Sequence, residues 1–201
     1  MITLNEIRTL VQAQSHTPAQ FEALPNQASV AMILADGEND LEVCFIRRAE
    51  RQGDPWSGQV AFPGGRAGSR DENAHAVAER ETHEEVGLML DESHRVGPLP
   101  IRQIARPGGV DDMVLSPFIY HIGEGKQSLA FAREPDEVAD VFWVPMRHLF
   151  HASSATELEY PMGGSPMSFP GIRFEDHVIW GLTLSVLESF ADIMRRKLPV
   201  Y

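Results

Sequence analysis

The sequence predicts a single α/β (α+β) domain built on a mixed β-sheet, with an additional helix near each end of the chain. Three observations support this fold class. The 201 residues are enough for one sizeable core, and 43% of them are hydrophobic. Segments with strand character outnumber segments with helical character. The two kinds do not alternate regularly, which argues against a parallel βαβ array.

Helices are predicted near both ends and once in the middle. Residues 3–14 place their apolar side chains on one face, and a threonine or asparagine at the start can cap this helix. Residues 72–86 are good helix formers without Pro or Gly, and Gly87 provides the stop. Residues 177–198 form an amphipathic C-terminal helix. A short helix or turn is expected at 147–152.

Short apolar runs bounded by turn residues predict the strands. The first two runs, joined by a turn at 37–40, form a hairpin. Residues 152–176 are rich in Gly, Pro and Ser, which fits either a long loop or a hairpin. The chain divides into an N-terminal helix and connector (1–27), a core (28–150), and a C-terminal loop and helix (151–201). The expected strands are 28–35, 41–48, 59–65, two within 97–123 separated by a loop at 106–112, and 137–146.

The composition excludes several classes of function. The net charge is −12 and the isoelectric point about 5.0, which argues against binding nucleic acid through a basic face. No apolar run of 18 residues occurs and the first residues lack a signal-peptide pattern, so we expect a cytoplasmic protein that does not enter a membrane. The lone Cys44 rules out an internal disulfide and is expected to be a buried small hydrophobe. A homodimer is compatible with the sequence.

The stretch "ERETHEE" in the middle helix carries four glutamates in seven residues. At about 100° per residue, Glu85 and Glu84 lie about 40° and 60° from Glu81, on opposite sides of it. Apolar residues of the same helix share this stripe, so the three glutamates interrupt the face that packs on the core. Glu79 points about 160° away and is expected to be an ordinary surface residue.

Three carboxylates on a core-facing stripe need a counter-charge. Carboxylates that share a site raise each other's pKa. A divalent cation removes this repulsion, and hard oxygen ligands select Mg²⁺, Mn²⁺ or Ca²⁺. We therefore predict a metal site formed by Glu81, Glu84 and Glu85, the alternative being a solvated helix face. Arg80 can pair with a carboxylate and orient it, and the turn at Gly64–Gly65 can expose a carbonyl as a further ligand.

These residues resemble the Nudix box. Its usual form is Gly, five residues, Glu, seven residues, then Arg-Glu-apolar-any-Glu-Glu-any-Gly-apolar, and "RETHEEVGL" (80–88) fits the second half. Thr82 stands where an apolar residue is usual. Asp71 keeps the spacing from Gly65 but lies nine residues before Arg80, so the box is one residue longer.

The lengthened box also resembles a subgroup, the coenzyme A pyrophosphatases. The element "GQVAFPGG" (58–65) fits the segment before the box in that subgroup. One segment departs from the pattern: where the subgroup usually has a histidine shortly before GQV, this chain reads "RRAERQGDPWSG" (47–58). Later elements that are also similar are "VLSPFIY" (114–120), "PDEVADVFWVPM" (135–146) and "IWGLT" (179–183).

The resemblance implies a Nudix-type α/β/α sandwich and hydrolysis of a pyrophosphate bond, with Mg²⁺ or Mn²⁺ as cofactor and a small-molecule nucleotide as substrate. Coenzyme A or a derivative is the first expectation, giving 3′,5′-ADP and a 4′-phosphopantetheine product. One alternative is another nucleoside diphosphate derivative, such as ADP-ribose or a nucleotide sugar, or a damaged dNTP. A further alternative is a catalytically silent sensor of nucleotides.

The resemblance also implies roles for individual residues of the box. Glu81 and Glu85 are the principal metal ligands, and Glu84 is a ligand or the general base. Gly65 contributes its carbonyl as a further ligand. Arg80 assists catalysis by orienting a carboxylate.

Residues outside the box complete the expected site. A loop carboxylate, Glu137 or Glu134, is a candidate base or additional ligand. Trp56 either stacks on a nucleobase or packs against the protein. The candidate phosphate-binding residues are Arg47, Arg48, Arg66 and Arg106. Arg47 and Arg48 are neighbours on one strand, so alternation allows only one of them to face the substrate.

Overall fold

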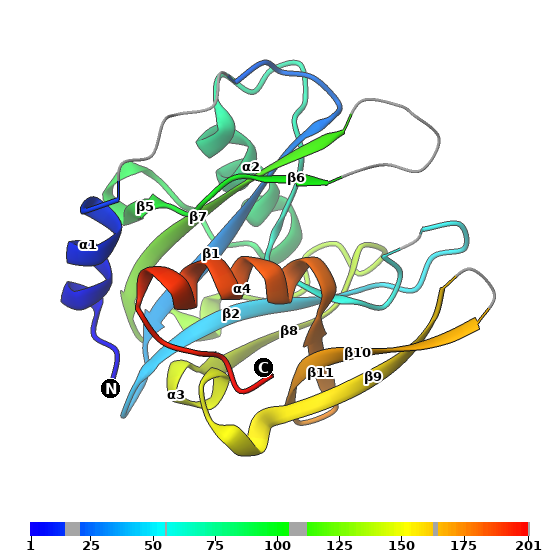
Figure 1. Cartoon of the computed structure of the whole chain (residues 1–201). Coiled ribbons are helices and arrows are strands. Elements are labelled where there is room, and N and C mark those ends of the chain that lie inside the picture. Colours follow the sequence, from blue (N-terminus) through cyan, green and yellow to red (C-terminus); the bar gives the residue numbers. More distant parts are fainter. Residues whose placement is uncertain (15–20, 55, 105–111, 163–164, 201) are drawn as a thin grey trace.

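The computed structural model describes residues 1–200 except 15–20, 55, 105–111, 163 and 164 (Figure 1). In this part of the chain, eight strands form one mixed sheet. They are β1 (Gln27–Asp36), β2 (Leu41–Arg48), β3 (Val60–Ala61), β4 (Gly64–Arg66), β5 (Arg95–Pro98), β6 (Arg102–Ile104), β7 (Met113–Glu124) and β8 (Val138–Pro145). The order is β3–β2–β1–β7–β5, with β4 paired to β1, β6 to β7 and β8 to β2. β1 and β7 pair in parallel and the other pairs are antiparallel, which confirms the predicted mixed sheet.

Helices cover both faces of this sheet (Figure 1). They are α1 (Leu4–Gln12), α2 (Ala74–Val86), the single turn α3 (Met146–Leu149) and α4 (Gly181–Ile193). Side chains of β1 alternate between two hydrophobic clusters, as a strand buried on both faces requires. Met32 and Leu34 belong to the cluster that contains residues of α1 and α4, whereas Ile33 and Ala35 belong to the cluster that contains residues of α2. The expected α/β/α layering is confirmed.

A second sheet of three strands lies beside the first in the described structure. It consists of β9 (Ala155–Met162), β10 (Ser165–Phe174) and β11 (His177–Trp180). β9 and β10 form a hairpin, which decides between the two alternatives for 152–176. The prediction of a helix from residue 177 is wrong, because residues 177–180 pair antiparallel with β10. The helix α4 begins at Gly181, whose positive φ of 59° allows the chain to leave the strand.

The capping residues set where the first two helices begin. The hydroxyl of Thr3 accepts a hydrogen bond from the Glu6 N–H, so Thr3 caps α1. α2 begins at Ala74 rather than at residue 72, because the Asn73 side chain accepts a hydrogen bond from the backbone further along the helix. Gly87 ends α2 in the left-handed conformation, as predicted.

The glycine pair before the helix is not a turn. Gly64 and Gly65 lie in β4 and pair with Val30 and Ser29 of β1. Gly64 has a φ of 151°, and a Cβ atom there would lie 2.3 Å from the carbonyl oxygen of Ser29. The backbone of β4 therefore runs directly against β1, and both glycines lie beside α2.

Glu79 corrects another expectation. Its Oε1 accepts hydrogen bonds from Arg95 Nε at 2.8 Å and from Tyr120 Oη at 3.3 Å, and its side chain is 18% exposed. Tyr120 Oη also lies 2.8 Å from His75 Nδ1. Glu79 is thus not an ordinary surface residue but joins α2 to β5 and β7. The position of Glu79 around the helix could not reveal these hydrogen bonds, because Arg95 and Tyr120 belong to other elements.

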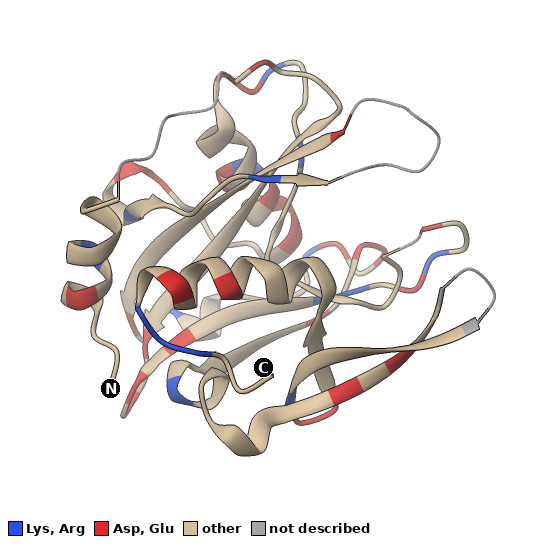
Figure 2. Ribbon diagram, in the orientation of Figure 1, with Lys and Arg blue, Asp and Glu red and all other residues tan. Residues whose placement is uncertain are grey.

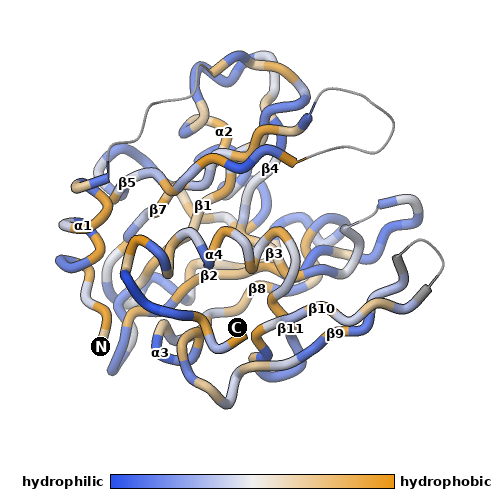
Figure 3. The backbone as a smooth tube through the Cα atoms, in the orientation of Figure 1, coloured by the Kyte–Doolittle hydropathy of each residue, from blue (hydrophilic) through white to orange (hydrophobic). Residues whose placement is uncertain are grey.

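Charge and hydropathy are distributed as in a folded domain with an apolar interior. Lys and Arg are interspersed with Asp and Glu along the ribbon (Figure 2), and hydrophobic residues concentrate on the central strands (Figure 3). Cys44 in β2 is fully buried, as predicted. Among the described residues, no helix is long and apolar enough to cross a membrane.

Candidate active site

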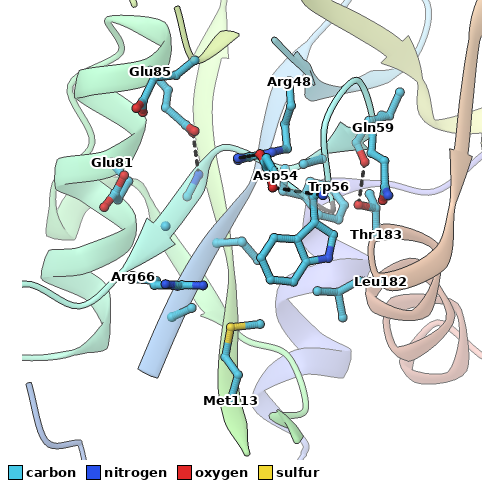
Figure 4. Close-up of a pocket in the computed structure, with 18 of the residues that line it drawn as sticks. Arg48, Asp54, Trp56, Gln59, Arg66, Glu81, Glu85, Met113, Leu182 and Thr183 are labelled. Atoms are coloured by element: carbon cyan, nitrogen blue, oxygen red, sulfur yellow. Dashed lines mark hydrogen bonds and ion pairs between the residues drawn. The ribbon is translucent and has the colours of Figure 1, made fainter. Parts of the chain in front are cut away.

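An open pocket of about 390 Å³ lies between α2, β4, the start of α4 and the loop that follows β2 (Figure 4). Its volume falls within the range of about 300–1,000 Å³ that is typical of small-molecule sites. Glu81 and Glu85 of α2 line one side. Met113 at the start of β7 and Leu182 of α4 line the other.

Glu81 and Glu85 project from α2 into this pocket. Glu85 is only 3% exposed, and burial raises its pKa to about 8 although a hydrogen bond from the Gly64 N–H, at 2.8 Å, favours the charged form. Burial also raises the pKa of Glu81, against the opposing effect of Arg80. The prediction that the glutamates do not lie on the solvated face of the helix is therefore confirmed for these two residues.

Gly65 provides the space that the Glu81 carboxylate occupies. A Cβ atom at residue 65 would lie 2.4 Å from Glu81 Cδ and 2.5 and 2.6 Å from its two oxygens. Steric space, rather than backbone strain, requires glycine at this position. The two glycines of β4 thus act differently: the N–H of Gly64 binds Glu85, and Gly65 leaves room for Glu81.

Arg80 connects four parts of the site. Its Nε and Nη2 donate to the two carboxylate oxygens of Asp71 at 3.0 and 2.9 Å. Its Nη1 donates to Glu81 Oε1 at 2.8 Å and to Glu84 Oε2 at 2.9 Å, and Nη2 also donates to the carbonyl of Arg66. Hydrogen bonds from Arg80 lower the pKa of Asp71 despite its burial. Asp71, the residue that carries the lengthened spacing, is therefore linked to Glu81 and Glu84 through Arg80.

Glu84 differs from the other two glutamates. Its side chain is 44% exposed, and it is not among the residues that line the pocket. The expectation that all three carboxylates avoid the solvated side is therefore wrong for Glu84, which lies at the edge of the stripe. Its role as a metal ligand or base stays a prediction.

The predicted phosphate-binding arginines have different environments. Arg48 lines the pocket with its Nη2 2.7 Å from Asp54 Oδ2. Arg47 is not among the lining residues, which agrees with alternation along β2. Arg66 lines the pocket and is exposed, and no carboxylate of the described residues forms an ion pair with it. Arg106 lies outside the described residues.

Of the two candidate loop carboxylates, Glu137 lines the pocket and Glu134 does not. Arg51 holds Glu137: its Nη2 lies 3.1 Å from Glu137 Oε1, and its Nε donates to the carbonyl of Asp136 at 2.6 Å. The structure thus brings Glu137 to the same pocket as Glu81 and Glu85, but its chemical role stays a prediction.

The apolar side of the pocket was not predicted from the sequence. Met113, Leu182 and Thr183 contribute to it from β7 and α4. The only signal in the sequence was the element "IWGLT" (179–183), which contains the two residues of α4. The segment that departs from the family pattern also reaches the pocket, through Trp56.

The chemistry of the carboxylate side fits a hard divalent cation. In the part of the chain that the structure describes, no three acidic, imidazole or thiol groups already converge on one point. Glu81 and Glu85 nevertheless offer hard oxygen donors, and both are held where water solvates them poorly. A cation bound between them would stabilise their charged forms.

Comparison with known proteins places the chain in a family. Residues 25–162 match the model of the NUDIX domain. The chain belongs to the Nudix hydrolase family. One relative is a protein of Yersinia enterocolitica named as the uncharacterized Nudix hydrolase NudL, with 28% identity over 191 residues that cover 94% of this chain and 92% of that protein.

Two further Nudix proteins are similar to this chain. The human mitochondrial coenzyme A diphosphatase NUDT8 is 30% identical over 175 residues, which cover 86% of this chain and 71% of that protein. The crystal structure of a MutT/nudix family protein from Enterococcus faecalis superposes with a TM-score of 0.52 at 19% identity, over 98% of this chain and 73% of that one. The latter likeness shows a shared fold. Nudix hydrolases generally use divalent metal ions, which agrees with the carboxylate side of the pocket.

Proposed function

We propose that this Nudix hydrolase cleaves the pyrophosphate bond of coenzyme A or a derivative, with Mg²⁺ or Mn²⁺ as cofactor. The observation that carries the proposal is a pair of poorly solvated glutamates on the wall of one open pocket: Glu85 is buried, and the side chain of Glu81 is 16% exposed. Two carboxylates in a poorly solvated place destabilise the fold unless a cation compensates them. The negative charges of a diphosphate substrate also need a cation to neutralise them.

Residues of α2 and β4 hold the metal side of the site. Glu81 and Glu85 would bind the cation, which supplies charge to neutralise the diphosphate and activates a water for attack on phosphorus. Arg80 orients Glu81 through Nη1 and is itself fixed by Asp71. The N–H of Gly64 fixes one oxygen of Glu85. The carbonyl of Gly65 is a candidate for a further ligand.

Residues on other elements would act on the substrate and the water. Glu137 is the best-placed candidate to accept the proton of the attacking water, because it lines the pocket and Arg51 fixes its carboxylate. Glu84 is the second candidate. Arg66 is available for a substrate phosphate because no described carboxylate pairs with it, whereas Arg48 already binds Asp54.

The choice of coenzyme A rests on similarity. A relative of 30% identity is named as a coenzyme A diphosphatase, and the elements "GQVAFPGG" and "IWGLT" resemble the same subgroup. The departure at residues 47–58 favours the alternative, another nucleoside diphosphate derivative such as ADP-ribose. Glu81, Glu84 and Glu85 are all present, which disfavours a catalytically silent sensor.

Kinetics on three substrates test the proposal. A charge-assisted contact to the 3′-phosphate is worth about 1.5–3 kcal/mol, so kcat/KM for coenzyme A should exceed that for 3′-dephospho-coenzyme A by about tenfold to a hundredfold. Mass spectrometry should identify 3′,5′-ADP and 4′-phosphopantetheine as products. Equal rates on the two forms, or faster hydrolysis of ADP-ribose, would contradict the choice of coenzyme A and leave the wider pyrophosphatase activity standing.

A further inference from the structure

The pocket has a second half that the metal chemistry does not use. Trp56 lines it together with Met113 and Leu182. In Figure 4 the indole of Trp56 lies beyond Arg66 as seen from Glu81, with Met113 and Leu182 beside it. In this view the pocket presents carboxylates, then an arginine, then an aromatic ring with two apolar side chains beside it.

The backbone around Trp56 is held in place by hydrogen bonds. Its N–H donates to Asp54 Oδ1 at 3.0 Å, and its carbonyl accepts from the Gln59 N–H at 3.2 Å. Burial raises the pKa of Asp54, but hydrogen bonds from Arg48 and from the Trp56 N–H outweigh it and keep the pKa below its ordinary value. Asp54 therefore stays ionised and ties the loop to β2. The backbone that carries the indole is thus already ordered, so a ligand need not order it on binding.

We propose that Trp56 is a specificity-determining residue whose indole stacks on the nucleobase of the substrate. A flat aromatic ring bordered by apolar side chains suits a planar base, since base–aromatic stacking is favourable and tolerant of base identity. In the view of Figure 4 Arg66 lies between this ring and the glutamates, the position that the phosphates of a stacked nucleotide would take. This inference rests on the proposed function only in taking the ligand to be a nucleotide.

The competing occupant of this half of the pocket is the pantetheine arm of coenzyme A. That arm is flexible and carries two amides, each needing a hydrogen-bond partner once it is removed from water. Met113 and Leu182 have no side-chain group that can serve a buried amide well, and the hydroxyl of Thr183 already donates to the Val60 carbonyl at 2.8 Å. The arrangement therefore favours the base over the arm.

The three tryptophans of the chain allow a test with internal controls. Trp143 packs against a core cluster, and Trp180 packs against Tyr160 and Phe169; neither lines the pocket. The protein with ¹⁵N-labelled indoles is titrated with AMP and, separately, with pantetheine, both with EDTA so that no metal takes part. AMP should shift the indole signal of Trp56 to saturation and leave the other two signals in place. Pantetheine should shift none of them.

Variants measure the contribution of the ring. The AMP affinity, followed by saturation-transfer NMR, should fall about fivefold to a hundredfold in Trp56→Ala and much less in Trp56→Phe, which keeps an aromatic ring. Phe169→Ala removes a ring outside the pocket and should leave the affinity unchanged. The inference is overturned if wild type does not bind AMP, if Trp56→Ala binds it as well as wild type, or if pantetheine rather than AMP shifts Trp56. A protein that binds AMP through Trp56 yet hydrolyses no diphosphate would contradict the proposed function alone.

Discussion

Arg80 binds Asp71 through two parallel hydrogen bonds, from Nε to Oδ1 at 3.0 Å and from Nη2 to Oδ2 at 2.9 Å. Asp71 is the acidic residue that lies one position further from the helix than the usual box places it. The longer connection thus still delivers a carboxylate to Arg80, which in turn holds Glu81. The one-residue-longer connection therefore does not prevent Asp71 from binding Arg80.

Asp71→Asn should weaken both stability and catalysis. The substitution replaces a charged acceptor of two hydrogen bonds, and each bond to a charged group contributes about 1.5–3 kcal/mol. Urea unfolding should show a loss of about 1–3 kcal/mol, and kcat should fall because Arg80 no longer positions Glu81. Asp176→Asn, at an exposed position in a turn, is the control and should change neither quantity. Wild-type stability and kcat in Asp71→Asn would show that the pair does not position Glu81.

Gly65→Ala tests whether the space beside Glu81 matters. The new Cβ would lie 2.4 Å from the Glu81 carboxylate carbon, so the side chain must move away. A displacement of about 1 Å in a catalytic group can cost about a hundredfold in rate, and we expect a loss of that size in kcat/KM. Gly68→Ala is the matched control, because its Cβ would meet Asp71 at 3.5 Å and Arg80 at 3.9 Å, which are ordinary contacts. Similar kinetics in the two variants would count against the steric argument.

Thr82→Val should stabilise the protein. Thr82 is fully buried on α2, and its hydroxyl has no hydrogen-bond partner among the described residues. Removing an unsatisfied buried hydroxyl without changing the shape should gain about 1–3 kcal/mol. Thr183→Val is the opposite case, since that hydroxyl donates to the Val60 carbonyl at 2.8 Å, and it should destabilise. Unfolding free energies that change in the same direction in both variants would disprove this assignment.

His75 should make stability depend on pH. Burial lowers its pKa from 6.5 to about 4, helped by Arg95 and opposed by Glu79. Between these two values the unfolded chain binds a proton that the folded protein does not, so stability falls as the pH is lowered through this window. In His75→Phe, which keeps a ring to stack on Phe118, the pH dependence should be flatter. Urea unfolding at a series of pH values checks this, and parallel curves for the two proteins would rule out the contribution of His75.

Local periodicity accounts for what the sequence predicted well. Helical spacing alone placed Glu81 and Glu85 on the core side of α2, because the apolar residues of the same helix fix which face is buried. Short, largely apolar runs predicted β1 and β2, which are buried on both faces.

Interactions between distant segments account for most of what the sequence analysis missed. The partners of Glu79 are Arg95 and Tyr120, which belong to the strands β5 and β7. The position of Glu79 around its helix therefore could not reveal them. Residues 177–180 have an apolar pattern that fits a helix or a strand, and pairing with β10 decides the outcome. The two alternatives for Trp56 stayed open because nothing in the local sequence shows that the loop joining β2 to the antiparallel β3 brings this residue to the pocket.

The most direct test of the central claim is the hydrolysis rate of Glu85→Gln over a range of Mg²⁺ and Mn²⁺ concentrations up to saturation. Glutamine keeps the size of Glu85 and removes the negative charge that the proposed metal site needs. Our account predicts that kcat/KM falls by several orders of magnitude at every metal concentration while the circular dichroism spectrum stays that of the wild type. A folded Glu85→Gln variant as active as the wild type across those concentrations would contradict the assignment of Glu85 as a metal ligand.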